Sequence, residues 1–305
     1  MDSQPTAHRA GYVAVIGRPN VGKSTLINTL LNQKIAAVSP RPQTTRRRQL
    51  GILTEPDAQI VFIDTPGLHI PQHKLGEFMN SEAVESLQDA DVLLWLIDAS
   101  TDLTEEDRLI AARLNALKRR PFTFILMTKA DLVAVDALEK RSRAAGELFP
   151  TAELLVISTV TRAGIDEMLG KVKSLLPQGE NFFDPDTITD YYERDIAAEL
   201  IRESALIYLR DEVPHALAVR IEQYQERSET NAYIEATILV ERESHKGIVI
   251  GQNAAMLKKI GTRARQEIES MSGRKVFLDL RVKVNKNWRN SPDALRLLGY
   301  TTSNK

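Results

Sequence analysis

The chain has 305 residues, of which 43% are hydrophobic and 27% charged, and it contains no cysteine. At roughly 100–200 residues per domain this length suits two domains, and the absence of cysteine excludes disulfides, thiol catalysis and cysteine-ligated zinc. The first ten residues are polar and the longest apolar run spans only residues 92–97, so we expect a cytoplasmic protein without a secretion signal or a membrane-spanning helix.

The first half of the chain alternates short apolar runs with helical patterns. Residues 12–16 indicate a buried strand and residues 23–32 a helix whose apolar side chains share one face. Further strands are expected at 60–63, 92–97, 122–127 and 154–157, and helices at 104–119 and 165–176. This alternation predicts an α/β domain over residues 1–178 with a doubly wound, mostly parallel sheet.

A phosphate-binding motif lies between the first strand and the first helix. Its residues fit G-x-x-x-x-G-K-[ST] in the strand–loop–helix context that the motif requires. Glycines let the backbone amides turn toward phosphate oxygens, and Lys23 neutralises the β- and γ-phosphate charges, while the Ser24 hydroxyl is a ligand for Mg²⁺. The expected contacts are Gly17, Arg18, Pro19, Asn20, Val21, Gly22, Lys23, Ser24 and Thr25.

The next expected strand ends in Asp64-Thr65-Pro66-Gly67, followed by Leu68. An aspartate at this position holds Mg²⁺ through water, and a glycine there offers its N–H to the γ-phosphate. Such a tetrapeptide is weak alone, but after a phosphate loop it predicts a γ-phosphate sensor.

Two later strand ends carry residues suited to a nucleobase. Thr128-Lys129-Ala130-Asp131 follows residues 122–127, and a carboxylate at Asp131 accepts from both N1–H and the exocyclic amine of guanine, which adenine lacks. The tripeptide Ser158-Thr159-Val160 follows the next strand and offers a backbone N–H to guanine O6. Together they predict selection of GTP over ATP, which argues against an ATP-dependent kinase.

Beyond the aperiodic stretch 177–190, which we interpret as a linker, the pattern changes. We expect helices at 195–209 and 253–271 and strands at 216–221, 232–240 and 275–284, with Ser291 capping a closing helix that begins at Pro292. Residues 242–305 hold 14 Lys and Arg against 5 Asp and Glu, whereas the rest holds 26 against 36. A compact α+β domain with a basic surface favours a polyanionic partner, the alternative being a solvated basic face.

With these motifs in this order, the chain resembles the Era family of bacterial GTPases over nearly all its length. The stretches that carry the resemblance are GRPNVGKSTLIN, QTTRRRQLGI, FIDTPGLH, TKAD and HKGIVIGQNAAMLKKIG. The resemblance implies a P-loop GTPase domain at 1–178, a linker at 179–192 and a type II KH RNA-binding domain at 193–305. It also implies binding to the 3′ region of 16S ribosomal RNA and a role in 30S subunit assembly. We expect a monomer, with peripheral association at the inner membrane as a further expectation.

The resemblance also assigns catalytic roles, to Lys23, Thr45, Asp64, Gly67 and Asn20. Many related GTPases orient the attacking water with Gln where this chain has Leu68, so another device is needed. Asn20 matches an asparagine that helps similar GTPases bind K⁺ near the phosphates, which predicts slow, K⁺-stimulated hydrolysis, the alternative being that Asn20 only shapes the turn; His69 as a general base ranks lower. In the first switch loop either Thr44 or Thr45 reaches Mg²⁺, and we favour Thr45, which gives Ser24, Thr45 and Asp64 as the metal ligands.

The base box departs from the family pattern, because Thr128 stands where Asn is usual and makes fewer bonds. In the basic domain, 245–261 resembles a KH core whose G-x-x-G turn ends here in Ala254, which we expect to fit a helical start. The RNA-binding residues expected are Lys246, Ile248, Val249, Ile250, Gly251, Gln252, Asn253, Ala254, Lys258 and Lys259. The alternative for the whole chain is an RNA-binding assembly factor that holds GTP as a structural ligand with negligible turnover.

Overall fold

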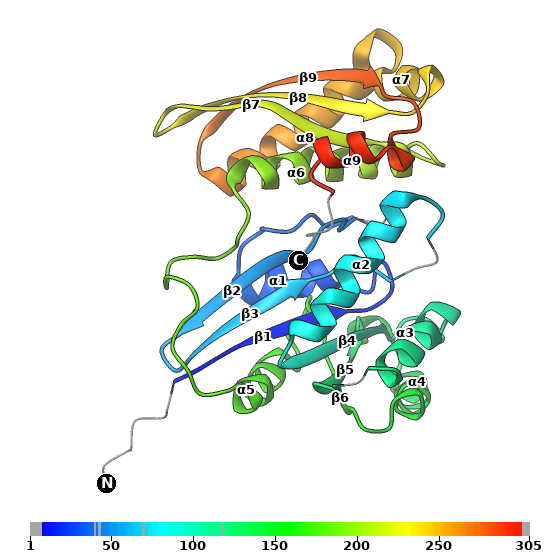
Figure 1. Ribbon diagram of the computed structural model, residues 1–305, viewed down its shortest axis with the longest axis vertical. Coiled ribbons are helices and arrows are strands. Elements are labelled where there is room, and N and C mark those ends of the chain that lie inside the picture. The colour runs from blue at the N-terminus through cyan, green and yellow to red at the C-terminus, as the bar shows by residue number, and fades with distance from the viewer. Residues whose placement is uncertain (1–7, 40, 42–43, 69–70, 118, 301–305) are drawn as a thin grey trace. The chain divides into compact units, whose positions relative to one another are not determined.

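The computed structural model describes residues 8–39, 41, 44–68, 71–117 and 119–300 (Figure 1). These residues divide into two compact units. The first lies within residues 1–32, 45–70 and 79–190, and the second within 33–44, 71–78 and 191–305. The segments 33–44 and 71–78 therefore belong to the second unit although they lie early in the chain. No pattern in the sequence predicts this grouping.

The first unit is built on a six-stranded sheet in the order β2-β3-β1-β4-β5-β6. Neighbouring strands are parallel except for the edge strand β2, which runs antiparallel to β3. The doubly wound, mostly parallel sheet predicted from the sequence is confirmed. The strands are β1 (Arg9–Ile16), β2 (Gln49–Glu55), β3 (Ala58–Asp64), β4 (Val92–Asp98), β5 (Phe122–Thr128) and β6 (Glu153–Val156).

Helices cover this sheet because its strands are apolar on both faces, as the fully buried β3 and β4 show. Apolar residues of α2, α3 and α4 join β1, β4 and β5 in one core cluster. The helices are α1 (Lys23–Leu31), α2 (Lys74–Asp89), α3 (Glu105–Asn115), α4 (Val135–Leu148) and α5 (Ile165–Leu175). Thr104 caps α3 and forms a reciprocal bond with Asp107, but the helix ends at Asn115 rather than at residue 119 as expected.

The segment after α5 is irregular, as expected for a linker, but it is bound to the first unit. The buried side chain of Gln59 accepts from the amides of Phe182 (2.7 Å) and Phe183 (3.0 Å) and donates to the Phe183 carbonyl (2.9 Å). Further on, the amide of Leu50 on β2 donates to the Asp190 carboxylate (2.8 Å) and that of Ile52 to the Ile188 carbonyl (2.9 Å). The segment therefore runs along the outer edge of β2.

The second unit has a three-stranded sheet in the order β7-β8-β9, with β7 antiparallel and β9 parallel to β8. Alternate strand residues pack on α6 and α8, which lie on one face of the sheet (Figure 1). Its elements are α6 (Glu193–Tyr208), β7 (Ala218–Ser228), β8 (Asn231–Val240), α7 (Glu243–Ile250), α8 (Ala255–Ser272), β9 (Lys275–Val284) and α9 (Pro292–Leu297), besides short 3-10 turns. Ser291 caps α9 as predicted.

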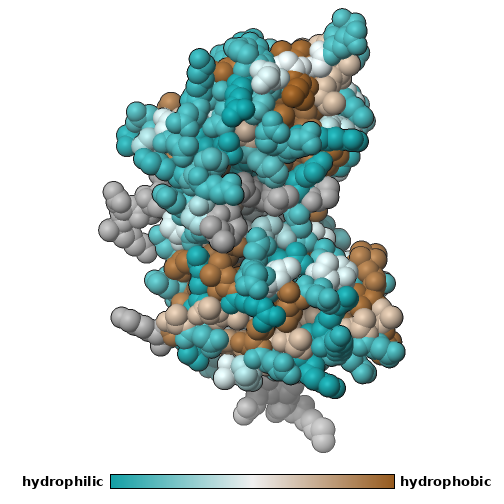
Figure 2. All heavy atoms as spheres, turned by 90° about the vertical axis from the view of Figure 1, so that its right-hand side faces the viewer, coloured by the Kyte–Doolittle hydropathy of each residue, from teal (hydrophilic) through white to brown (hydrophobic). Residues whose placement is uncertain are grey.

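Figure 2 shows one face of the molecule. In the face that Figure 2 shows, hydrophilic side chains predominate and apolar ones form scattered patches. Among the described residues, no helix combines the length and apolar character that crossing a membrane requires.

Candidate nucleotide and RNA sites

The loop between β1 and α1 is closed around the Lys23 ammonium. Gly17 and Gly22 have φ angles of 150° and 103°, and a Cβ on Gly17 would lie 2.7 Å from the Leu96 carbonyl oxygen. Lys23, the first residue of α1, donates from Nζ to the carbonyls of Gly17 (3.0 Å) and Arg18 (3.1 Å). Backbone amides, a helix N-terminus and an ammonium thus meet in one place, an arrangement that attracts phosphate.

Burial disfavours the charged forms of Lys23 and Asp64. Burial lowers the pKa of Lys23 to about 8, an effect that Asp64 opposes and Arg18 adds to. Burial likewise raises the pKa of the Asp64 carboxyl, against the opposing influence of Ser24, Lys23 and Thr45. An anionic ligand beside Lys23 and a cation beside Asp64 would each relieve part of this cost.

Three oxygen atoms converge beside the loop. Ser24 Oγ donates to Asp64 Oδ2 (2.7 Å), and Thr45 Oγ1 lies 3.1 Å from the same carboxylate oxygen and 2.9 Å from Ser24 Oγ. Asp64 Oδ1 is buried and has no hydrogen-bond partner among the described residues, so one lone-pair face of the carboxylate is left for a ligand. Two hydroxyls and a carboxylate fit a hard cation such as Mg²⁺. Thr44 lies elsewhere, its hydroxyl donating to the Arg41 carbonyl (2.7 Å).

The tetrapeptide after β3 closes against the phosphate loop. Thr65 Oγ1 donates to the Val15 carbonyl (2.8 Å), and a Cβ on Gly67 would lie 2.9 Å from Pro19 N. Leu68 is only 1% exposed and belongs to the core, so its side chain is unable to hold water over a phosphate. His69, the rival general base, lies outside the described residues.

The base-side residues are tied together by the Ser158 hydroxyl. It donates to Asp131 Oδ1 (2.6 Å) and accepts from the amides of Val160 (3.2 Å) and Thr161 (3.1 Å). The Ser158 amide donates to the Ala163 carbonyl (3.0 Å). These bonds fix the loop beside an Asp131 that stays exposed to solvent.

Thr128, the departure from the family pattern, braces the phosphate loop. Its buried hydroxyl lies 2.8 Å from the Val21 carbonyl oxygen and 3.2 Å from that of Ile97. A hydroxyl has one hydrogen, so the two carbonyls share it. Thr128 therefore keeps the loop-bracing bond of an asparagine but has no further donor for a base.

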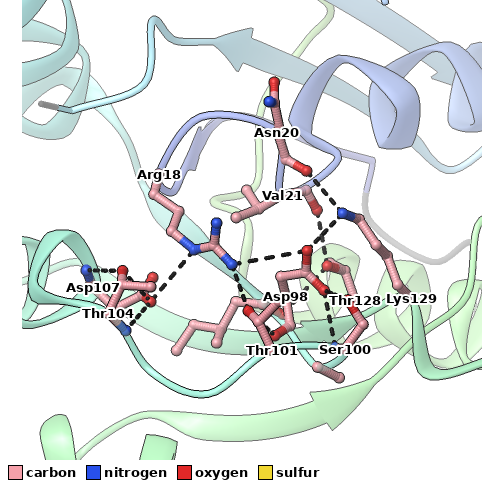
Figure 3. A network of polar contacts seen from close by, with 12 residues as sticks. Arg18, Asn20, Val21, Asp98, Ser100, Thr101, Thr104, Asp107, Thr128 and Lys129 are labelled. Atoms are coloured by element: carbon pink, nitrogen blue, oxygen red, sulfur yellow. Dashed lines mark hydrogen bonds and ion pairs between the residues drawn. The ribbon is translucent and has the colours of Figure 1, made fainter. Parts of the chain in front are cut away.

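Sequence reasoning missed Asp98, at the carboxyl end of β4. It accepts from Lys129 Nζ (2.6 Å) and lies 3.8 Å from the Arg18 guanidinium, while Lys129 also donates to the Asn20 carbonyl (2.9 Å) (Figure 3). Burial acts to raise the pKa of Asp98, yet the hydrogen bonds from Lys129 and Ser100 hold it below its usual value. The available signal was its position, since Asp64 likewise terminates β3, a parallel strand of the same sheet.

The glycine turn of the second unit lies between α7 and α8. Gly251 has φ 71°, and a Cβ there would approach Met256 Cβ to 2.8 Å, so glycine is required. Asn253 (φ 51°) and Ala254 (φ 60°) also adopt left-handed conformations. The expectation that Ala254 fits a helical start is wrong, because it precedes α8 in a conformation that alanine disfavours. Gln252 and Asn253 are exposed at the tip.

The apolar residues before the turn belong to α7, a helix that the KH resemblance implies but that no hydrophobic periodicity indicates. Val249, predicted to bind RNA, is fully buried in the core and therefore unable to contact a base, and Ile250 packs partly on the core. Ile248 remains 49% exposed. Lys258 is exposed, and the Lys259 ammonium lies 4.4 Å from the centre of the Tyr208 ring; the remaining predicted lysine, Lys246, is half-buried on α7.

Buried charges on α6 hold the early segment 33–44 within the second unit. Glu203, 2% exposed, accepts from Lys34 Nζ (2.8 Å) and from the Val38 amide (3.0 Å). Arg202, also buried, donates to the Thr44 carbonyl. The segment 33–44 is therefore bound to α6 at Lys34, Val38 and Thr44.

The phosphate loop, the oxygen cluster and the base-side carboxylate define a P-loop nucleotide-binding domain, and the glycine turn between two helices beside a three-stranded sheet defines a KH-type module. Residues 12–129 match the family of 50S ribosome-binding GTPases and residues 212–289 the KH domain family. The chain is 43% identical over 297 residues to GTPase Era of Ruminiclostridium cellulolyticum, covering 97% of this chain and 99% of that protein. The chain belongs to the Era family of GTPases.

Solved structures agree with this assignment. A crystal structure of Era in complex with MgGDPNP and nucleotides 1506–1542 of 16S ribosomal RNA has a TM-score of 0.91 at 39% identity, covering 97% of this chain and all of that one. A substituted Era from Aquifex aeolicus bound to GDP·AlF4⁻ has a TM-score of 0.90 at 38% identity, with 96% and 100% coverage. The predicted fold class, a GTPase domain followed by a KH domain, is confirmed.

Proposed function

We propose that this GTPase binds GTP with Mg²⁺ at the loop of residues 17–25, hydrolyses it to GDP and phosphate, and through its nucleotide state gates the binding of 16S ribosomal RNA during 30S assembly. The observation that carries this is the convergence of Ser24, Thr45 and Asp64 beside a buried ammonium, where Asp64 Oδ1 has no partner in the part of the chain that the structure describes. Bound Mg²⁺ would neutralise β- and γ-phosphate charge. The relatives crystallised with MgGDPNP and with GDP·AlF4⁻ support the assignment.

Base selection falls to Asp131, with Ser158 orienting one carboxylate oxygen. Within the tripeptide, the amides of Ser158 and Val160 donate to described groups, and Thr159 has no such bond among the residues that the structure describes. We assign the Thr159 amide to guanine O6. A site built on these groups rejects adenine because its own polar groups would stay unpaired.

Nucleotide competition tests the base assignment. Asp131→Asn replaces the double acceptor with an amide that donates, so it should weaken GTP binding by roughly 100-fold or more and favour XTP. Asp136→Asn, the same change at an exposed position on α4, is the matched control and should alter neither affinity. Unchanged GTP preference in Asp131→Asn would refute the assignment.

We assign K⁺-assisted hydrolysis to Asn20, an exposed loop residue, because the buried Leu68 is unable to orient water. A monovalent cation beside the phosphates stabilises charge that develops in the transition state. Asn20 has φ 64°, so Asn20→Gly preserves the backbone and removes only the amide. The variant should lose the excess of the rate in KCl over that in matched NaCl. Equal rates in the two salts for the unaltered protein would exclude K⁺ assistance.

RNA binding is assigned to the turn of residues 251–254 and its flanking lysines. The glycine at 251 lets an RNA backbone approach closely, and Lys258 and Lys259 supply phosphate charge. Charge reversal at both lysines should weaken binding to single-stranded RNA and reduce the slope of log affinity against log salt by about 2. The same reversal at Lys140 and Arg143 on α4 is the matched control.

Gating is supported by the contacts of the switch segment. The Thr44 carbonyl accepts a hydrogen bond from Arg202 of α6. The next residue, Thr45, lies beside the Asp64 carboxylate. Loss of the γ-phosphate would release Thr45, and this would change the neighbouring contact of Thr44 with Arg202 on α6. Single-turnover measurements with and without RNA separate this switch from a factor that holds GTP structurally, which would show negligible hydrolysis in both. Action in the cytoplasm, peripheral attachment at the inner membrane and a monomeric state remain predictions.

A further inference from the structure

The KH-type sheet has a second face, opposite to α6 and α8. Core residues of β8 and β9 alternate with residues that point away from the helices, since successive strand residues face opposite sides. The strand register aligns the outward residues in rows across the sheet: Gln225 with Tyr233 and Phe277, and Asn231 with Lys275. These rows lie at the end of the sheet where β7 turns into β8.

One row carries an exposed aromatic stack. The rings of Tyr233 and Phe277 are parallel to within 15°, with centres 5.7 Å apart. The Arg227 guanidinium lies 4.6 Å from the centre of the Tyr233 ring. Phe277 is the end of the stack and is 65% exposed, on a strand that forms the edge of the sheet.

The surroundings of the stack are basic. Arg227 on β7 and Lys275 on β9, both between the row and the hairpin end of the sheet, form no ion pair with a carboxylate among the described residues. Over the outward positions of the sheet, five basic side chains face three acidic ones, a net charge of +2. These residues are Arg220, Arg227, Lys275, Arg281 and Lys283 against Glu222, Glu235 and Asp279.

We propose that this stack is a second RNA-binding surface, on which an unpaired base of single-stranded RNA stacks against Phe277 while Arg227 and Lys275 contact the adjoining phosphates. A protein partner fits less well, because one exposed ring among charged side chains lacks the continuous apolar centre of a protein interface. Planar rings with a guanidinium and unpaired cations are what sequence-tolerant binding of single strands uses. The surface extends the RNA-binding role proposed above and does not use the turn at 251–254.

The experiment compares two substitutions that share apolar character but differ in shape. Phe277→Leu keeps an apolar side chain without a planar face, and Phe277→Trp keeps the face. Full-length protein is titrated against fluorescent single-stranded RNA of about 20 nucleotides, long enough for more than one contact region. Phe277→Leu should weaken binding about 10-fold, within the range for loss of one stacked base, and Phe277→Trp should bind at least as tightly as the unaltered protein.

Tyr192→Leu, at an aromatic residue 76% exposed before α6, is the control and should leave affinity unchanged. The proposal is overturned if Phe277→Leu binds RNA like the unaltered protein, or if the leucine and tryptophan variants are equally weak. It is also overturned if Phe277→Leu keeps its affinity for free RNA and loses only that for the small ribosomal subunit, which would identify a protein partner. If charge reversal at Lys258 and Lys259 has no effect while Phe277→Leu weakens binding, the turn assignment fails and this surface stands.

Discussion

Removing the Thr128 hydroxyl should weaken the binding of both GTP and GDP, because it braces the loop that holds the phosphates they share. Thr128→Val is nearly isosteric and deletes one donor, 2.8 Å from the Val21 carbonyl oxygen in a buried site. Leaving a buried carbonyl unsatisfied costs about 1–3 kcal/mol. If about 1–2 kcal/mol of that is lost from the ordered loop, each nucleotide should bind about 5- to 30-fold more weakly. Thr128→Asn, with two donors, should keep the brace and tighten binding.

The assay is titration calorimetry with GDP and a non-hydrolysable GTP analogue, alongside urea unfolding. Thr123→Val is a matched control, because Thr123 lies on the same strand, is 4% exposed and donates to the Pro121 carbonyl (3.0 Å), away from the nucleotide. It should lower the free energy of unfolding while leaving both affinities unchanged. The reasoning fails if Thr128→Val affects affinity no more than Thr123→Val does, or weakens GTP alone.

Three further outcomes are expected. Since burial lowers the pKa of Lys23 to about 8 and phosphate favours its charged form, GTP binding should take up a proton between pH 8 and the ordinary 10.5 and weaken as pH rises through this window; calorimetric enthalpies that do not depend on buffer ionisation at pH 9 would contradict this. Ala254→Gly should raise the free energy of urea unfolding by up to about 1 kcal/mol, because glycine tolerates φ 60°. Gly251→Ala should lower it by about 1–3 kcal/mol through the clash with Met256 and a strained φ, and a change smaller than that of Ala254→Gly would count against the geometry.

The sequence predicted the parallel sheet well because its central strands are continuous apolar runs ended by functional residues. It predicted α7 poorly. That helix spans only eight residues, and its apolar triplet beside a glycine lacks a helical period. The expected strand at 216–221 in fact runs to Ser228, since its outer half is a polar ribbon with little to bury and so no alternation. The helix α4 was not predicted either. The reason is similar, because this helix buries only Ala145 fully and so shows little hydrophobic pattern.

The sequence singles out candidate site residues where the chemistry of a side chain suits one role, as at Lys23 and Asp131, and these roles stay predictions. What stayed hidden depends on tertiary geometry. Asp98 acquires its place only when Arg18 and Lys129 converge on it, and the stack of Tyr233 with Phe277 exists only through the register of β8 with β9. The residue pattern within one segment gives no information on which residues of another segment will contact it.

The bonds between Gln59, β2 and the segment 182–190 bear on protein solubility. An edge strand with open amides is a template for pairing with other chains, and here Leu50 and Ile52 already donate to residues of that segment. A fragment ending at residue 178 would expose this edge and remove three hydrogen bonds of the buried Gln59 side chain, leaving its bond to Thr54 Oγ1 (2.9 Å). The segment that joins the two domains thus also covers an edge through which the first domain could self-associate. A GTPase fragment that keeps residues to 190 should stay monomeric, whereas a shorter fragment should aggregate.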